Sequence, residues 1–359
     1  SRHSSAASAS VMSATIEPRS TPLRSRQFEL LRAVADRLSG RAAQPLAWSL
    51  ADVQRAGVAT GLTALAASLG VFDTTDGAVA DYLADQRAEV ARRHERFAAV
   101  VPRVLELLCD AGVTAVPVKG AVLCGHSGDV PVWPEPAARP MSDVDILVPP
   151  EQRSRAASTL AAAGWRLHSS SAFEDTYLAW GDGAVGRTDG ESADHNGRIE
   201  VHPGWGEFLH GYVARGASVE REWPLEVVAA HVIGHLGSTV VRAEVRAVNV
   251  IDVFFLDQHG VSWDGVAQVL HDVDPRLSAP GVWFAHAVFP DAVPFELVRA
   301  ELRRLPRPHV FDRVQPETLL RDPTQRTTVR WRRAFASSTG EQVEVLRQVA
   351  GSVMARLRR

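Results

Sequence analysis

The spacing of apolar residues over 76–111 predicts one long amphipathic helix. Apolar side chains recur there at intervals of three and four residues, and Gly112 follows as a helix-ending glycine. Residues 26–69 carry a similar helical pattern. Further helical segments are predicted after Pro224, over 224–237, 241–260 and 263–273. Helices are therefore expected on both sides of the centre of the chain.

Short apolar runs replace this periodicity in the centre of the chain. Runs rich in β-branched residues predict strands over 113–120, 143–148, 165–169 and 198–202, with a helix over 151–164. Pro- and Gly-rich stretches over 125–140 and 181–197 predict loops. The fold class is therefore α+β.

The same patterns divide the chain into four parts. A lead-in or tag, predicted to be disordered, covers 1–25, and an N-terminal helical segment covers 26–111. A small mixed β-sheet core is expected over 112–222, followed by a C-terminal helical domain over 223–359.

Length and charge limit the classes of function. A chain of 359 residues is long enough for about two domains. Lys and Arg number 39 and Asp and Glu 42, a near balance that makes long nucleic acid an improbable partner. The Arg-rich segment 301–359 keeps an acidic peptide or another polyanion open as a partner.

Cysteine content and hydropathy favour a cytoplasmic protein. The two cysteines, Cys109 and Cys124, cannot build a disulfide framework and fit a reducing compartment. No apolar run reaches the ~18 residues of a membrane span, so no membrane association is expected. The start of the chain lacks the pattern of a secretory signal.

Lys119 is the only lysine of the chain, and all the other residues among its 39 Lys and Arg are arginine. A lysine kept in such a sequence indicates a position that needs a compact ammonium group rather than a planar guanidinium. Lys119 ends a predicted strand, and Gly120 permits close approach of the backbone to a ligand. A helix that starts at Ala121 would turn free N–H groups toward an anion, so this turn is a candidate phosphate cradle.

Three carboxylates are candidates for one metal site. Asp143 and Asp145 point to the same face of a predicted strand, because successive side chains alternate. Glu200 lies between Ile199 and Val201 in another strand, and pairing of the two strands would gather all three carboxylates. Clustered carboxylates require a compensating cation, and oxygen ligands select Mg²⁺ or Mn²⁺. Two such ions form the clamp used in phosphoryl transfer.

These residues carry a resemblance to a known family. KGAVL, ARPMSDVDILV, the helix that ends at Gly164, and RIEVH together resemble the DNA polymerase beta-type nucleotidyltransferase superfamily. More specifically they resemble its uncharacterised nucleotidyltransferase family, in which KG replaces the usual glycine-serine turn. The resemblance covers residues 112–205 well, and AAHVIGHL and VRAVNVIDVFFL more weakly.

The resemblance implies a reaction and a role for each residue. The implied activity is a Mg²⁺-dependent transfer of a nucleoside monophosphate from an NTP, most readily ATP, to a hydroxyl acceptor on a small molecule or peptide, with release of pyrophosphate. Asp143 and Asp145 would bind both metals, and Glu200 would bind one and help to activate the acceptor. Lys119, Gly120 and Arg139 would bind the triphosphate. His202 shares the strand face of Glu200 and, on that ground, is a candidate to shape the metal site, to contact the substrate or to make a structural hydrogen bond.

Two other functions stay open at this point, namely a non-catalytic nucleotide- or peptide-binding protein and a metal-dependent phosphoesterase. His231 and His235 have the spacing of a zinc pair, but Val232 stands where a metalloprotease has glutamate. We interpret both histidines as part of a partly buried helix face. Cys124 has no base partner evident in the sequence, and we interpret it as a packing residue.

Overall fold

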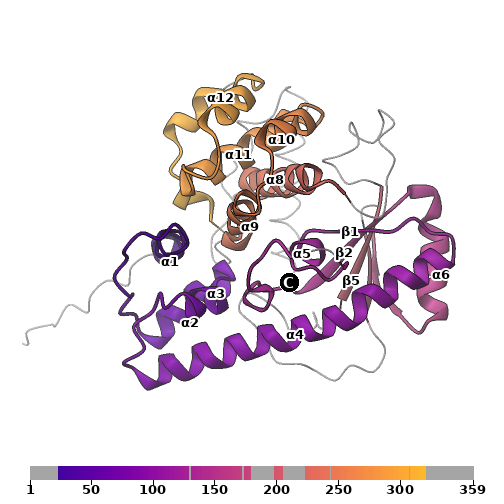
Figure 1. Ribbon diagram of the computed structural model, residues 1–359, viewed down its shortest axis with the longest axis horizontal. Helices are drawn as coiled ribbons and strands as arrows, with labels where there is room; N and C mark the ends of the chain where they lie inside the picture. The colour runs from indigo at the N-terminus through magenta and orange to yellow at the C-terminus, as the bar shows by residue number, and fades with distance from the viewer. Residues whose placement is uncertain are drawn as a thin grey trace, which may run out of the picture.

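The structure is a computed structural model in which the centre of the chain and most of both helical regions are described (Figure 1). The described residues are 23–128, 131–171, 174–178, 198–204, 223–242, 244–306 and 308–320. The predicted lead-in up to residue 22, the predicted loop over 181–197 and the Arg-rich segment beyond residue 320 lie outside them.

The N-terminal region consists of three helices and one much longer helix. The short helices are α1 (Leu23–Leu38), α2 (Leu50–Thr60) and α3 (Thr63–Ser68). Helix α4 (Gly77–Asp110) begins at the N-cap Asp76, whose side chain accepts a hydrogen bond from the Ala78 N–H. It matches the helix predicted over 76–111, and Figure 1 shows it running from the N-terminal helices to the sheet.

Helix α4 joins two separate hydrophobic cores. Val79 and Leu83, in its first half, pack in a core shared with α1 and the C-terminal helices. Phe97 and Val104, in its second half, pack in the core beneath the sheet. One rigid element therefore positions the sheet relative to the helical part of the molecule.

Among the described residues, five strands form one mixed sheet in the order β1-β2-β5-β4-β3. Their bounds are β1 (Val116–Val118), β2 (Asp143–Val148), β3 (Arg166–Ser170), β4 (Asp175–Leu178) and β5 (Arg198–Pro203). Strand β2 pairs parallel with β5 and antiparallel with β1, whereas β4 pairs antiparallel with both β5 and β3. The sequence patterns predicted every strand except β4, and they made β1 too long.

The two faces of the central strands differ in chemistry. On one face Val144, Ile146, Ile199 and Val201 are buried in the core that includes α4 and residues of α6 (Arg153–Ala162). The alternate residues of β2 and β5 point to the opposite face and are mostly charged. Burial of one face fixes the pairing register, because a shift by one residue would exchange the two sets.

The described part of the C-terminal region contains five α-helices. They are α8 (Leu225–Arg242), α9 (Ala247–Gln258), α10 (Trp263–Leu270), α11 (Pro275–Val288) and α12 (Phe295–Arg303). Two glycines let α8 and α11 approach closely. A Cβ atom at Gly237 would lie 1.6 Å from the Leu277 carbonyl oxygen, and one at Gly281 would lie 2.2 Å from that of Ile233.

The α+β class, with a small mixed sheet between helical regions, is confirmed by this arrangement. Within the described part of the chain, the helices are too short or too polar for one of them to cross a membrane.

Candidate active site

The pairing of β2 with β5 brings the three predicted carboxylates together. Asp145 lies directly opposite Glu200 in the parallel register, and Asp143 lies opposite Arg198. Asp145 and Glu200 are buried, whereas the Asp143 side chain is 27% exposed. One ligand atom from each of Asp145, Glu200 and His202 lies within 4.8 Å of the other two. The sheet therefore presents a compact set of oxygen and nitrogen donors.

Lys119 reaches this cluster from the end of β1. Its Nζ donates a hydrogen bond to Oδ1 of Asp145 over 2.7 Å. Among the described residues, Lys119 is the only non-glycine residue with positive φ, at φ 53° and ψ −124°. These angles are close to those of the first central residue of a type II′ turn, where glycine is favoured. The chain therefore holds a lysine in a backbone conformation that costs of order 1–3 kcal/mol.

Gly120 allows the turn after Lys119 to pack closely. A Cβ atom at position 120 would lie 2.5 Å from Nη1 of Arg139 and 3.0 Å from Cε of Met141. The short helix α5 (Gly120–Leu123) then begins at this position. Gly120 is thus required for packing against Arg139, whatever it also contributes to ligand binding.

Arg198 and His202 supply further positive and polar groups to the cluster. Arg198 contacts Glu200 through Nη2, and the same nitrogen lies 3.4 Å from Oδ2 of Asp143. His202 Nε2 lies 2.9 Å from Oδ1 of Asp145. The sequence analysis did not single out Arg198. The alternation of RIEVH carried the signal, because Arg198, Glu200 and His202 share one face of a strand.

Ion pairing shifts the pKa values of Asp145 and of the two basic side chains that contact it. Burial alone would raise the pKa of Asp145, but Lys119 and His202 hold it well below its usual range. Burial alone would lower the pKa of Lys119, but its hydrogen bond to Asp145 and the other carboxylates raise it. Burial likewise opposes the charged form of His202, whose pKa is raised by the hydrogen bond to Asp145.

Glu200 behaves differently from its neighbour Asp145. Burial, together with the charges of Asp143 and Asp145, raises its pKa to about 7, and Arg198 offsets only part of this effect. Near neutral pH the Glu200 carboxyl is therefore only partly ionised. Carboxylates that lie this close compete for the available positive charge. An additional cation would displace the remaining proton, so these donors fit a divalent metal ion with oxygen ligands.

Arg139 makes its contacts outside the carboxylate cluster. Its Nε and Nη2 each donate a hydrogen bond of 2.8 Å to the two carboxylate oxygens of Asp252 on α9. Trp133 Nε1 donates to the same carboxylate over 2.9 Å. Burial opposes the charged form of Arg139, yet Asp252 raises its pKa. This buried pair joins the loop before β2 to the C-terminal helices.

Helix α8 adds a neutral histidine near the cluster. His231 is buried, and its pKa is lowered to about 3 by burial and by the charges of Lys119 and His202. Trp223, just before α8, packs against Val118 and Leu147, which lie on the same sheet face as Asp145. The C-terminal region therefore covers part of the charged face. The expectation of buried histidines is confirmed for His231.

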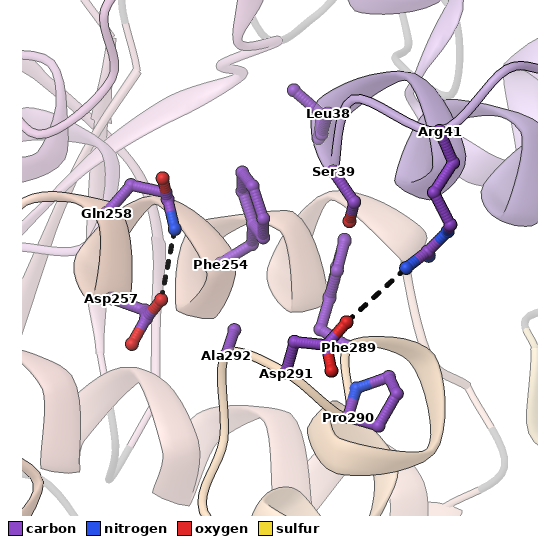
Figure 2. A pocket seen from close by; sticks show the side chains of 10 residues that line it. All are labelled: Leu38, Ser39, Arg41, Phe254, Asp257, Gln258, Phe289, Pro290, Asp291 and Ala292. Carbon is purple, nitrogen blue, oxygen red and sulfur yellow. Dashed lines mark hydrogen bonds and ion pairs between the residues drawn. The ribbon is translucent and has the colours of Figure 1, made fainter.

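A separate pocket of about 230 Å³ lies away from these carboxylates (Figure 2). It is formed where the end of α1 meets the ends of α9 and α11. Phe254 and Phe289 supply much of its apolar surface, and Arg41 pairs with Asp291 at its edge over 3.5 Å. None of its lining residues was predicted as a site residue.

Comparisons with known proteins give one match. The sequence model described as "Uncharacterised nucleotidyltransferase" matches residues 46–226, a range that contains every predicted site residue. Searches of the curated proteins and of the solved structures returned no match.

Proposed function

The chain belongs to the uncharacterised nucleotidyltransferase family, whose general activity is nucleotidyl transfer, and we propose that it transfers a nucleoside monophosphate from an NTP to a hydroxyl acceptor with release of pyrophosphate. The observation that carries this proposal is the juxtaposition of Asp145, Glu200 and Lys119. Lys119 lies within hydrogen-bond distance of Asp145, which lies opposite Glu200 in the register. The carboxylate pair that we propose as metal ligands and an ammonium group therefore adjoin one another.

The proposed cofactor is Mg²⁺ or Mn²⁺. Asp143, Asp145 and Glu200 would hold it, and His202 offers a fourth donor beside them. When bound, such ions neutralise charge on the transferring phosphoryl group and on the leaving pyrophosphate. The raised pKa of Glu200 supports this assignment, because burial and the charges of Asp143 and Asp145 disfavour its ionised form, and a bound cation would offset both effects.

The other roles belong to the side chains around the cluster. Lys119 is the proposed cation for the β- and γ-phosphates, since its side chain is 25% exposed and extends from a glycine-bounded turn. Glu200, when deprotonated, is the proposed base for the proton of the acceptor hydroxyl. His202 is 21% exposed at the same face and is a proposed substrate contact. Arg139 is proposed to act at a distance, by holding Gly120 and the loop before β2 in place.

One observation favours a second candidate, a protein that binds nucleotides without transferring them. The Arg198 guanidinium lies between Asp143 and Glu200, where it neutralises charge that a metal ion would otherwise neutralise. If Arg198 permanently replaces the ion, the fold would retain nucleotide recognition and lose the chemistry.

The experiment that separates these functions follows the α-phosphate and the γ-phosphate of the NTP separately. The full chain is incubated with Mg²⁺, fractions of cell extract as acceptors, and ATP or another NTP labelled at the α- or the γ-phosphate. Transfer predicts α-label on an acceptor and γ-label in pyrophosphate. A phosphoesterase would release labelled phosphate or free nucleotide, and a binding protein would produce neither.

Variants connect the reaction to the cluster. Asp143→Ala and Asp145→Ala should each lower transfer by at least about a hundredfold, because charge stabilisation by the ions is a large part of catalysis. Asp85→Asn removes an exposed carboxylate on α4 and is the matched control. Transfer at the wild-type rate in both active-site variants would disprove the assignment of these residues.

A further inference from the structure

We propose that His94, Cys124 and His126 form a second metal site, which binds a borderline-soft transition ion, Zn²⁺ in particular. One ligand atom from each of the three residues lies within 4.8 Å of the other two. All three residues are buried, with exposed fractions of 5–7%. The proposal does not depend on the transferase activity, because none of these residues belongs to the carboxylate cluster.

The hydrogen bonds of His94 leave a nitrogen lone pair directed at the cluster. Its Nε2 lies 2.5 Å from the carbonyl oxygen of Arg139, and a carbonyl only accepts, so Nε2 carries the proton. Its Nδ1 is then unprotonated and lies 2.8 Å from Nε2 of His126. A ligating histidine commonly donates its other N–H to a backbone carbonyl, which fixes the tautomer and the ring orientation.

The surroundings favour neutral imidazoles, the form that binds metals. Burial lowers the pKa of both His94 and His126 to about 4, with further lowering from neighbouring positive charge. Burial raises the pKa of the Cys124 thiol to about 12, so the sulfur stays protonated until a metal ion replaces the proton. A nitrogen lone pair on His94, a neutral imidazole of His126 that can free its Nε2 lone pair by a shift of tautomer, and a displaceable thiol proton share one buried space, and these are the components of a metal site.

The donor set selects the ion. Two imidazoles and one thiolate are softer than the oxygen donors of the carboxylate cluster, and mixed histidine and cysteine ligands are typical of Zn²⁺. Mg²⁺ prefers oxygen ligands and would stay with the carboxylates. The two sites therefore differ in the metals that they bind. A spectroscopic signal from a metal–sulfur bond identifies only the site with Cys124.

Binding exchanges protons for metal without a change in oxidation state. The ion forms bonds to Nδ1 of His94, Nε2 of His126 and Sγ of Cys124. The thiol proton of Cys124 is released to solvent. The proton on Nε2 of His126 moves to Nδ1 of the same ring, which frees the Nε2 lone pair for the ion and leaves the ring neutral. Three protein ligands leave one position of a four-coordinate ion for a water molecule.

The site would join α4 to the segment that directly follows Lys119 and Gly120. His94 comes from the middle of α4, Cys124 ends α5, and His126 follows two residues later. Helix α5 begins at Gly120, directly after Lys119. An ion that ties the end of α5 to α4 would therefore stabilise the turn that presents Lys119.

The test uses Co²⁺, whose thiolate complexes absorb light through sulfur-to-metal charge transfer. The full chain, freed of metal with a chelator, is titrated with Co²⁺ and then with Zn²⁺. We expect a charge-transfer band that saturates at about one equivalent and disappears when Zn²⁺ displaces Co²⁺. Cys124→Ser should abolish the band, and His94→Gln and His126→Gln should each weaken Co²⁺ binding by at least about tenfold.

Cys109→Ser is the matched control, because it removes the only other cysteine of the chain. It should leave the band unchanged, and so should Glu200→Gln, which alters the carboxylate cluster. Absence of the band in the wild-type chain would overturn the proposal, and so would its loss in Cys109→Ser rather than Cys124→Ser. The wild-type titration decides the question even if a ligand variant fails to fold.

Discussion

Lys119 donates a hydrogen bond to Asp145 from a backbone conformation that favours glycine. The distance between Nζ and Oδ1 is 2.7 Å, and the backbone angles are φ 53° and ψ −124°. The ammonium group is thus retained at a position where its own Cβ atom is unfavourable. A strained residue in a cluster of charges indicates that the side chain is kept for function.

The strain at Lys119 predicts that a glycine variant is more stable than an alanine variant at this position, the reverse of the order expected within a helix or strand. Lys119→Gly and Lys119→Ala both remove the ammonium group, but only glycine relieves the backbone. We expect the glycine variant to be more stable than the alanine variant by about 1 kcal/mol in urea denaturation. Greater stability of the alanine variant would show that the turn imposes no strain at this position.

Replacement of Lys119 by arginine tests the need for an ammonium group. Lys119→Arg keeps the charge, but the larger planar guanidinium has a different reach and geometry beside Asp145. We expect kcat/KM for the NTP to fall by about tenfold or more, with little change in melting temperature. An arginine variant with full efficiency would leave the single lysine of the chain without a functional explanation.

The buried pair of Arg139 and Asp252 predicts strong coupling in a double-mutant cycle. Asp252→Leu leaves the guanidinium without its partner and should cost about 3–5 kcal/mol of unfolding free energy. Arg139→Met should cost a similar amount, whereas the double variant should cost much less than their sum. The exposed pair of Arg26 and Glu29 is the control, and Glu29→Gln should cost less than about 1 kcal/mol. Additive costs at Arg139 and Asp252 would mean that the two are not paired.

The ion pair of Arg153 with Asp175 predicts a pH-dependent contribution to stability. The hydrogen bonds from Arg153 lower the pKa of Asp175 below the model-peptide value of 3.8. Its contribution is therefore present above pH 3.8 and is lost as the pH falls through the lower pKa of the folded state. Asp175→Asn should cost about 2 kcal/mol at pH 7, and the difference from wild type should shrink in acid. A cost that does not change with pH would exclude this ion pair as its source.

Patterns along the chain predicted many of the helices and most of the sheet because burial imposes a period on the sequence, but α11 and α12 were not predicted individually. Helix α4 follows its apolar spacing closely, and β2 and β5 coincide with their apolar runs. Strand β4 was missed, since DTYL is short and has little apolar alternation. Its position depends on antiparallel pairing with β5, which is a long-range contact.

The sequence predicted those site residues whose common orientation follows from alternation within one strand. It did not predict contacts between segments that are far apart in the sequence. Asp143 and Asp145 share a face by alternation alone, and the structure places Glu200 beside them. The partner of Arg139 is 113 residues away in sequence, so no local pattern revealed its pairing with Asp252. The approach of His94 to Cys124 and His126 likewise depends on how α4 packs against α5.

The most direct test of the metal-binding carboxylate cluster is calorimetric titration of the full chain with Mn²⁺ in the presence of a non-hydrolysable NTP. This measurement needs no knowledge of the acceptor. We expect saturable Mn²⁺ binding to the wild-type chain and to Asp85→Asn. We also expect an affinity at least about tenfold lower for Asp145→Asn and Glu200→Gln. Equal Mn²⁺ affinity in the wild type and in both cluster variants would contradict the proposed metal site.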